Sequence, residues 1–129
     1  AARKEPFGDL IGRVVRAKNR TPLGCYLYYG RPGGIALVLQ IFSGQEHVNT
    51  IVKSLLADVN DLGCVAVRGR SQPDFLDALL QNGCVFKRAP SVTMHSRRAE
   101  LLAAIRAGDA LVTGLAGETW TRLIHGQFV

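Results

Sequence analysis

The chain has 129 residues, of which 47% are hydrophobic and 20% are charged. This length predicts one domain, residues 1–129, and the composition excludes an intrinsically disordered chain. The longest apolar run, 35–42, is interrupted by Gln40 and is too short to cross a bilayer, so we expect no membrane contact. No signal-peptide pattern is present and the first residue is Ala, so we expect a cytoplasmic domain cut from a longer parent.

The net charge of +6 is unevenly distributed. Residues 1–35 contain seven of the sixteen Lys and Arg but only two of the ten acidic residues. On an extended strand, Arg16, Lys18 and Arg20 would share one face. No aromatic residue alternates with them and no binding motif accompanies them, so we expect a solvated or packing surface and no nucleic-acid partner.

Neither cysteine nor histidine occurs in a spacing typical of a metal site. The residues concerned are Cys25, Cys64, Cys84, His47, His95 and His125. An odd number of cysteines cannot all pair, and all three lie in apolar segments. We therefore expect free thiols in a reducing compartment and no metal.

The first third of the chain predicts three strands, at residues 10–18, 25–29 and 35–42. Turn residues separate them at Asn19–Gly24 and Arg31–Gly34. Because short turns join neighbouring strands, we expect an antiparallel meander.

A long amphipathic helix is predicted next, over residues 47–62. Its apolar residues recur at helical spacing: Val48, Ile51, Val52, Leu55, Leu56, Val59 and Leu62. Gly63 suits a helix end. A strand at 65–67 follows, and a right-handed crossover would place it parallel to strand 35–42.

The remaining segments extend this pattern. Pro73 suits the first turn of a helix that runs to Asn82. Strands are predicted at 84–87 and 92–95, a helix at 99–107, and a last strand at 109–115. The order β-β-β-α-β-α-β-β-α-β predicts an α+β domain with a mixed, mostly antiparallel sheet.

The turn Ser43–Glu46 lies between the third strand and the long helix. The first N–H groups of a helix lack intrahelical partners, so this turn is a candidate phosphate site. Ser43 and Glu46 also match the capping box S-x-x-E, in which these side chains occupy the same donors. The carboxylate would also repel a phosphate, and both interpretations stay open.

Other candidate residues lie on the strands. Arg68 and Arg70 follow the parallel strand and could bind a carboxylate or phosphate; alternatively, they face solvent or pair with Asp74 and Asp77. Three tyrosines on strand 25–29 are expected to pack in the core, and Tyr28 is the best proton donor among them if chemistry occurs.

Residues 10–120 resemble the GCN5-related N-acetyltransferase (GNAT) family in element order and hydrophobic pattern. The segments that carry the resemblance are Ile35–Phe42, Ser43–Glu46, His47–Leu62, Cys64–Arg68 and Gln72–Gly83. It implies a GNAT-like β-β-β-α-β-α-β-β core, with an extra C-terminal helix and strand. The end of the chain is similar to bacterial proteins that contain two such domains.

The resemblance implies transfer of an acyl group from acetyl-CoA or another acyl-CoA to an amine. The pantetheine arm would enter between strands 35–42 and 64–68. The acyl-CoA would contact Ile41, Phe42, Ser43, Gly44, Gln45, Glu46 and His47. Arg68 and Arg70 would bind substrate, and Tyr28 would supply the proton.

The sequence also departs from the family pattern. The family's phosphate loop is Gln/Arg-x-x-Gly-x-Gly/Ala, whereas this chain has only Gly44 between Gln40 and Glu46. Leu79 stands where the family often has a proton-donating Tyr. The family's first strand and first two helices have no counterpart. The alternative is therefore a non-catalytic module that forms a homodimer or packs against the rest of its parent.

Overall fold

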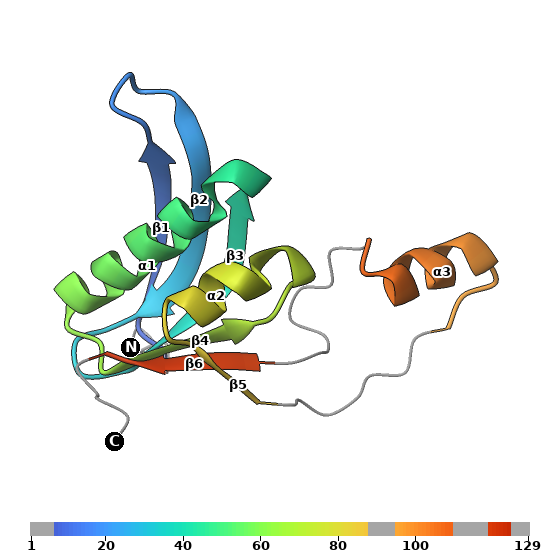
Figure 1. Cartoon of the computed structure of the whole chain (residues 1–129). Coiled ribbons are helices and arrows are strands. Elements are labelled where there is room, and N and C mark those ends of the chain that lie inside the picture. The colour runs from blue at the N-terminus through green and yellow to red at the C-terminus, as the bar shows by residue number, and fades with distance from the viewer. Residues whose placement is uncertain (1–6, 88–94, 110–118, 125–129) are drawn as a thin grey trace.

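The computed structural model describes residues 7–87, 95–109 and 119–124 (Figure 1). The elements in chain order are β1 (Asp9–Arg16), β2 (Pro22–Gly30), β3 (Ile35–Ser43), the 3₁₀ turn η1 (Gln45–His47), α1 (Val48–Leu62), β4 (Ala66–Arg70), the 3₁₀ turn η2 (Pro73–Phe75), α2 (Leu76–Gln81), β5 (Val85–Lys87), α3 (Ala99–Ala107) and β6 (Thr119–Leu123).

The strands form one six-stranded sheet in the order β1-β2-β3-β4-β6-β5. β1, β2 and β3 are an antiparallel meander, β3 and β4 are parallel, and β6 pairs antiparallel with both β4 and β5. The predicted α+β class, the mixed and mostly antiparallel sheet, and the parallel crossover are thereby confirmed.

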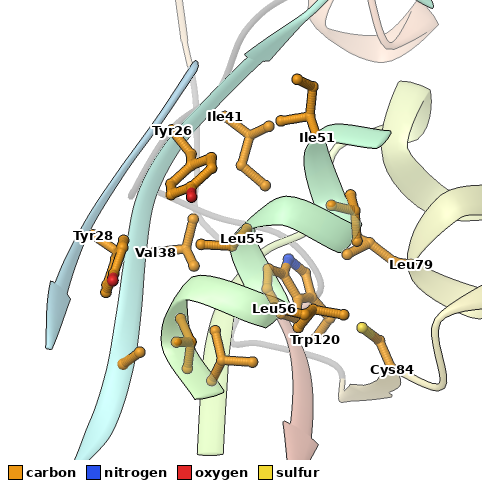
Figure 2. Close-up of a cluster of buried hydrophobic side chains, with 14 of the residues drawn as sticks. Tyr26, Tyr28, Val38, Ile41, Ile51, Leu55, Leu56, Leu79, Cys84 and Trp120 are labelled. Carbon is orange, nitrogen blue, oxygen red and sulfur yellow. The ribbon is translucent and has the colours of Figure 1, made fainter. Parts of the chain in front are cut away.

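Helix α1 covers one face of the sheet and forms the core with it (Figure 2). Its predicted apolar stripe is buried, and Ile51, Val52, Leu55 and Val59 have no exposed surface. Burial of each such side chain contributes roughly 1.5–3 kcal/mol. Gly63 ends α1 with φ +89°, a conformation in which a side chain would be strained.

The far half of the sheet is packed against α2 on the same face. Trp120 of β6 is 1% exposed and lies over Gly69 of β4, where an added Cβ would be 2.9 Å from Cζ2 of the indole. Arg122 Nε donates to the carbonyl of Asn82 at 2.7 Å, which satisfies a carbonyl at the end of α2.

The opposite face of the meander carries apolar side chains that the described residues leave exposed. Leu10, Val14 and Phe42 are 54%, 56% and 53% exposed. Phe7 packs against Tyr29 on this face, with ring centroids 6.4 Å apart.

Several predicted boundaries change. The strand predicted at 10–18 ends at Arg16, because Ala17 and Arg20 form a turn with Arg20 at φ +66°. Arg16, Lys18 and Arg20 therefore do not share a strand face, and that prediction was wrong. Strands 92–95 and 109–115 lie almost wholly outside the described residues.

The strand β6 was not predicted. Its sequence, Thr119-Trp-Thr-Arg-Leu123, is short and has only two apolar residues, three apart, so it shows no alternation typical of a strand. No helix in the described ranges is long and apolar enough to cross a membrane.

Candidate functional site

The two parallel strands β3 and β4 separate soon after they meet. Their pairing is limited to Ile35–Leu37 against Ala66–Arg68, although β3 continues to Ser43 and β4 to Arg70. Figure 1 shows the two strands diverging. Among the described residues, the edge of β3 that faces β4 therefore has no ladder partner beyond Leu37, and its backbone groups can pair with an extended ligand.

A β-bulge lies where the strands separate. Tyr28 of β2 pairs with Val38 and Leu27 pairs with Gln40, so Leu39 is an extra residue on β3. A bulge leaves its extra residue outside the regular ladder and re-aims the adjacent backbone groups. The open edge of β3 therefore begins at a bulge, a place where a backbone N–H can point at a ligand.

The cleft between the strands is narrow. Its walls are Val38, Leu39, Gln40, Ile41, Arg70, Gln72 and Phe75. Its volume is about 10 Å³, which is room for roughly one water molecule. An extended ligand must therefore widen the cleft in order to enter it.

Two buried polar atoms at this cleft lack hydrogen-bond partners among the described residues. They are Nε2 of Gln40, on the cleft wall, and Oγ of Ser71, between two wall residues. A buried polar group without a partner costs about 1–3 kcal/mol. A ligand with amide or carbonyl groups would supply partners here.

The turn at residues 43–47 does not form the predicted capping box. Ser43 is still part of β3, and its hydroxyl donates to the carbonyl of Gly44 at 2.8 Å. The 3₁₀ turn η1 separates it from α1, and no side chain caps either η1 or α1. The capping interpretation was therefore wrong: no side chain occupies the N–H groups at this end, and the N–H of His47 donates to the carbonyl of Gly44 at 3.0 Å.

The surroundings of this turn leave room for a ligand. An added Cβ on Gly44 would meet only the ring of His47, at 3.9 Å. No described residue therefore excludes a larger side chain there, and the exposed glycine leaves its backbone accessible from outside. Glu46 is exposed at the same turn and would lower the affinity for an anion.

The two predicted substrate-binding arginines lie at different places on β4. Arg68 is exposed in mid-strand, between Leu37 of β3 and Thr121 of β6. Arg70 is half-buried and lines the cleft. Within the described ranges, neither forms an ion pair with Asp74 or Asp77. Their role in substrate binding stays a prediction.

Tyr28 lies under α1 rather than on the cleft wall (Figure 2). Its hydroxyl lies 3.1 Å from Oδ2 of Asp58, and that of Tyr26 lies 3.2 Å from the same atom. Arg13 Nε is 3.3 Å from this oxygen as well. The predicted packing of these tyrosines with satisfied hydroxyls is therefore observed for Tyr26 and Tyr28.

Burial and the negative charge of Asp58 raise the pKa of Tyr28 well above its ordinary value of 10.0. The same causes, burial first, raise the pKa of Tyr26. A higher pKa makes Tyr28 a weaker acid, so its contacts favour a structural role, and proton donation by it stays a prediction.

Sequence reasoning missed Asp58, although a signal was present. Asp58 is seven residues after Ile51 and three after Leu55, so it lies on the apolar stripe of α1. A carboxylate at such a position must find donors on the packed strands. Tyr26 and Tyr28 on β2 were the candidate donors for this carboxylate.

Leu79 is a fully buried residue of α2, and its side chain has no polar atom to offer to the cleft. No group of three or more His, Cys, Asp or Glu within residues 7–87, 95–109 and 119–124 is arranged to hold a metal ion. The polar side chains that line the cleft are Gln40, Arg70 and Gln72.

Comparison with known proteins identifies the fold. No protein-family model and no curated protein matches the sequence. A protein named as an acyl-CoA N-acyltransferase from Klebsiella pneumoniae superposes with a TM-score of 0.54 and 12% identity, over 88% of this chain and 72% of that one. A GNAT-family acetyltransferase from Staphylococcus aureus superposes with a TM-score of 0.54 and 7% identity, over 88% of this chain and 67% of that one.

An aminoglycoside 6'-acetyltransferase type Ii gives a TM-score of 0.51 and 12% identity, over 95% of this chain and 72% of that one. The chain therefore has a GNAT-like fold, as its sequence pattern indicated. The neighbours are acetyltransferases or acyltransferases, and the shared feature at this identity is the fold.

Proposed function

We propose that this chain is an acyl-CoA-dependent N-acyltransferase domain whose co-substrate binds between β3 and β4. The observation that carries the proposal is the open edge of β3, which begins at the Leu39 bulge after only three residue pairs with β4. An extended pantetheine arm can pair with such an edge as a short strand does.

The turn at residues 43–47 would hold the pyrophosphate. Its N–H groups are free of side-chain caps, and Gly44 leaves space beside them. These groups and the positive end of α1 attract an anion. Ile41 and Phe42 lead β3 into this turn and would contact the arm on its way to the phosphates.

The chain would act mainly by positioning. An amine nitrogen attacks the thioester carbonyl carbon, the C–S bond breaks, and the thiolate takes up the proton that the amine loses. A backbone N–H at the bulge would stabilise the negative charge on the carbonyl oxygen. Leu79 has no proton to give, and the Tyr28 hydroxyl is hydrogen-bonded to Asp58 and lies off the cleft wall, so the proton would pass from the amine to the thiolate directly or through water.

Arg68 and Arg70 would bind an anionic group of the acceptor or of the acyl-CoA. Arg70 lines the cleft, which suits this role better than the exposed site of Arg68. We also propose a cytoplasmic location, because Cys25, Cys64 and Cys84 are free thiols.

Calorimetric titration with acetyl-CoA and with acetyl-pantetheine tests the proposal. We expect acetyl-CoA to bind and acetyl-pantetheine, which lacks the pyrophosphate, to bind more weakly. Entry of the arm must widen the cleft, so the fluorescence of Trp120, the only tryptophan, should change as well. A folded sample that binds neither compound at millimolar concentration would refute the proposal.

A second candidate function is a non-catalytic packing module. The exposed apolar side chains of Leu10, Val14 and Phe42 favour it, because contiguous apolar surface of this kind marks an interaction site. Under this alternative the β1–β3 face would be covered by another copy or by another part of the parent protein. A monomer that binds acetyl-CoA would contradict it.

A further inference from the structure

The two edges of the sheet differ in a way that bears on assembly. At one edge, β5 is only three residues long and ends in Lys87. At the other, β1 is eight residues long and, among the described residues, pairs with β2 alone. An edge strand exposes unpaired N–H and C=O groups, and proteins blunt such edges with short strands, Lys, Pro or bulges.

The edge strand β1 is blunted only by its charged residues, Asp9, Arg13 and Arg16. It contains neither Lys nor Pro, and its pairing with β2 is regular from Asp9 to Val15, with a shift only at Arg16. An open groove of about 410 Å³ lies between β1 and α1. The helix therefore does not cover this edge.

The sequence of β1 is complementary to itself in the antiparallel direction. Asp9 lies near its start, and Arg13 lies four residues later on the same face. A two-fold axis at Ile11 places Asp9 of each copy directly opposite Arg13 of the other, which makes two identical ion pairs. An axis at Arg13 would instead place two arginines opposite each other, a destabilising arrangement.

The geometry of Arg13 suits such a pair. Its Nε contacts Asp58 at 3.3 Å, while its side chain remains 56% exposed. A guanidinium has five N–H donors, so its terminal nitrogens remain for a second carboxylate. The contact with Asp58 also fixes the side chain before association.

We propose that two copies of this chain pair through β1, antiparallel, with Ile11 at the two-fold axis. The sheet then continues across both copies, and the exposed side chains of Leu10 in the two copies lie on the same face. This interface gives the packing module proposed above a definite partner, a second copy of the chain. It does not depend on acyl-CoA binding.

Sedimentation of the 129-residue chain over a wide concentration range tests the proposal. The wild-type chain should dimerise, and Asp9→Lys should weaken the dimer on the order of tenfold or more, because two attractive pairs become repulsive. Glu100→Lys is the matched control: the same charge change at an exposed residue of α3 should leave the dimer intact. Neither variant should change the affinity for acetyl-CoA.

Cysteine cross-linking tests the register. In a Cys25→Ala background, Ile11→Cys should form an intermolecular disulfide on mild oxidation, because residues at the axis face each other directly. Val14→Cys, three residues from the axis, should not. A chain that stays monomeric at every concentration overturns the proposal, as does a dimer unaffected by Asp9→Lys. If Ile11→Cys fails to fold, the sedimentation comparison still decides.

Discussion

Tyr28 of β2 donates its hydroxyl hydrogen to Oδ2 of Asp58 on α1 across a distance of 3.1 Å. The same oxygen accepts from Tyr26 and contacts Arg13, so one carboxylate joins the helix to two strands. In a core that is otherwise apolar, this contact fixes how α1 is rotated on the sheet.

Asp58→Ala should lower the free energy of unfolding by about 1–3 kcal/mol, because the Tyr28 hydroxyl loses its acceptor and Tyr26 keeps only the carbonyl of Ser54, at 3.4 Å. Asp61→Ala, an exposed residue on the same helix, should change it by less than about 0.5 kcal/mol. Urea denaturation followed by circular dichroism measures both. Equal effects of the two substitutions would show that the Asp58 contacts contribute nothing net.

Stability should fall as the pH rises above about 10. The pKa of Tyr28 is raised in the folded chain, so above its unfolded value of 10.0 the folded state retains a proton that the unfolded state has lost. A proton that only the folded state retains lowers the free energy of unfolding by up to about 1.4 kcal/mol for each pH unit. Urea denaturation at several pH values should show a shallower fall for Tyr28→Phe than for Tyr29→Phe. A fall of equal slope in both variants would exclude Tyr28 as its source.

Gly69→Ala should destabilise the chain by about 1–3 kcal/mol. The new methyl group would lie 2.9 Å from the buried indole of Trp120, and so tight a core has no room for it. Gly44→Ala is the control, because its methyl would touch only the ring of His47, at 3.9 Å. Thermal unfolding compares them, and a Gly69→Ala variant as stable as Gly44→Ala would contradict the packing described.

Glu46→Gln should increase the affinity for acetyl-CoA about fivefold. Two unit charges at about 4 Å in water repel by about 1 kcal/mol, and the substitution removes one of them from the turn. The gain should shrink as salt is added. Asp61→Asn also removes one negative charge, but at the other end of α1, and should leave the affinity for acetyl-CoA unchanged. Calorimetric titration measures both, and an unchanged affinity in Glu46→Gln would place the phosphates elsewhere.

The fold could be predicted from sequence where periodicity is strong. The apolar stripe from Val48 to Leu62 and the short turns between the first three strands were sufficient for α1 and the meander. The strand β6 escaped prediction because Trp120 and Leu123, its two apolar residues, are three apart and give no strand period. Its position is decided by pairing with β4 and β5, which are distant in sequence.

The candidate site was predictable in its place but not in its geometry. The strand–turn–helix order located the turn at residues 43–47. The bulge at Leu39 carries no Gly or Pro signal and follows from the register with β2. The capping-box pattern misled because Ser43 pairs with Gly24 as the last residue of β3, which removes it from the helix end.

The Asp58 contacts have a consequence for the distant end of α1. Val48, where the helix begins, is ten residues from Asp58, roughly 15 Å along the helix axis. Since α1 is rigid over that length, its rotation at Asp58 also decides where the N–H groups of the 43–47 turn point. A substitution at Asp58 could therefore misdirect those donors and weaken anion binding while every residue of the turn remains unchanged.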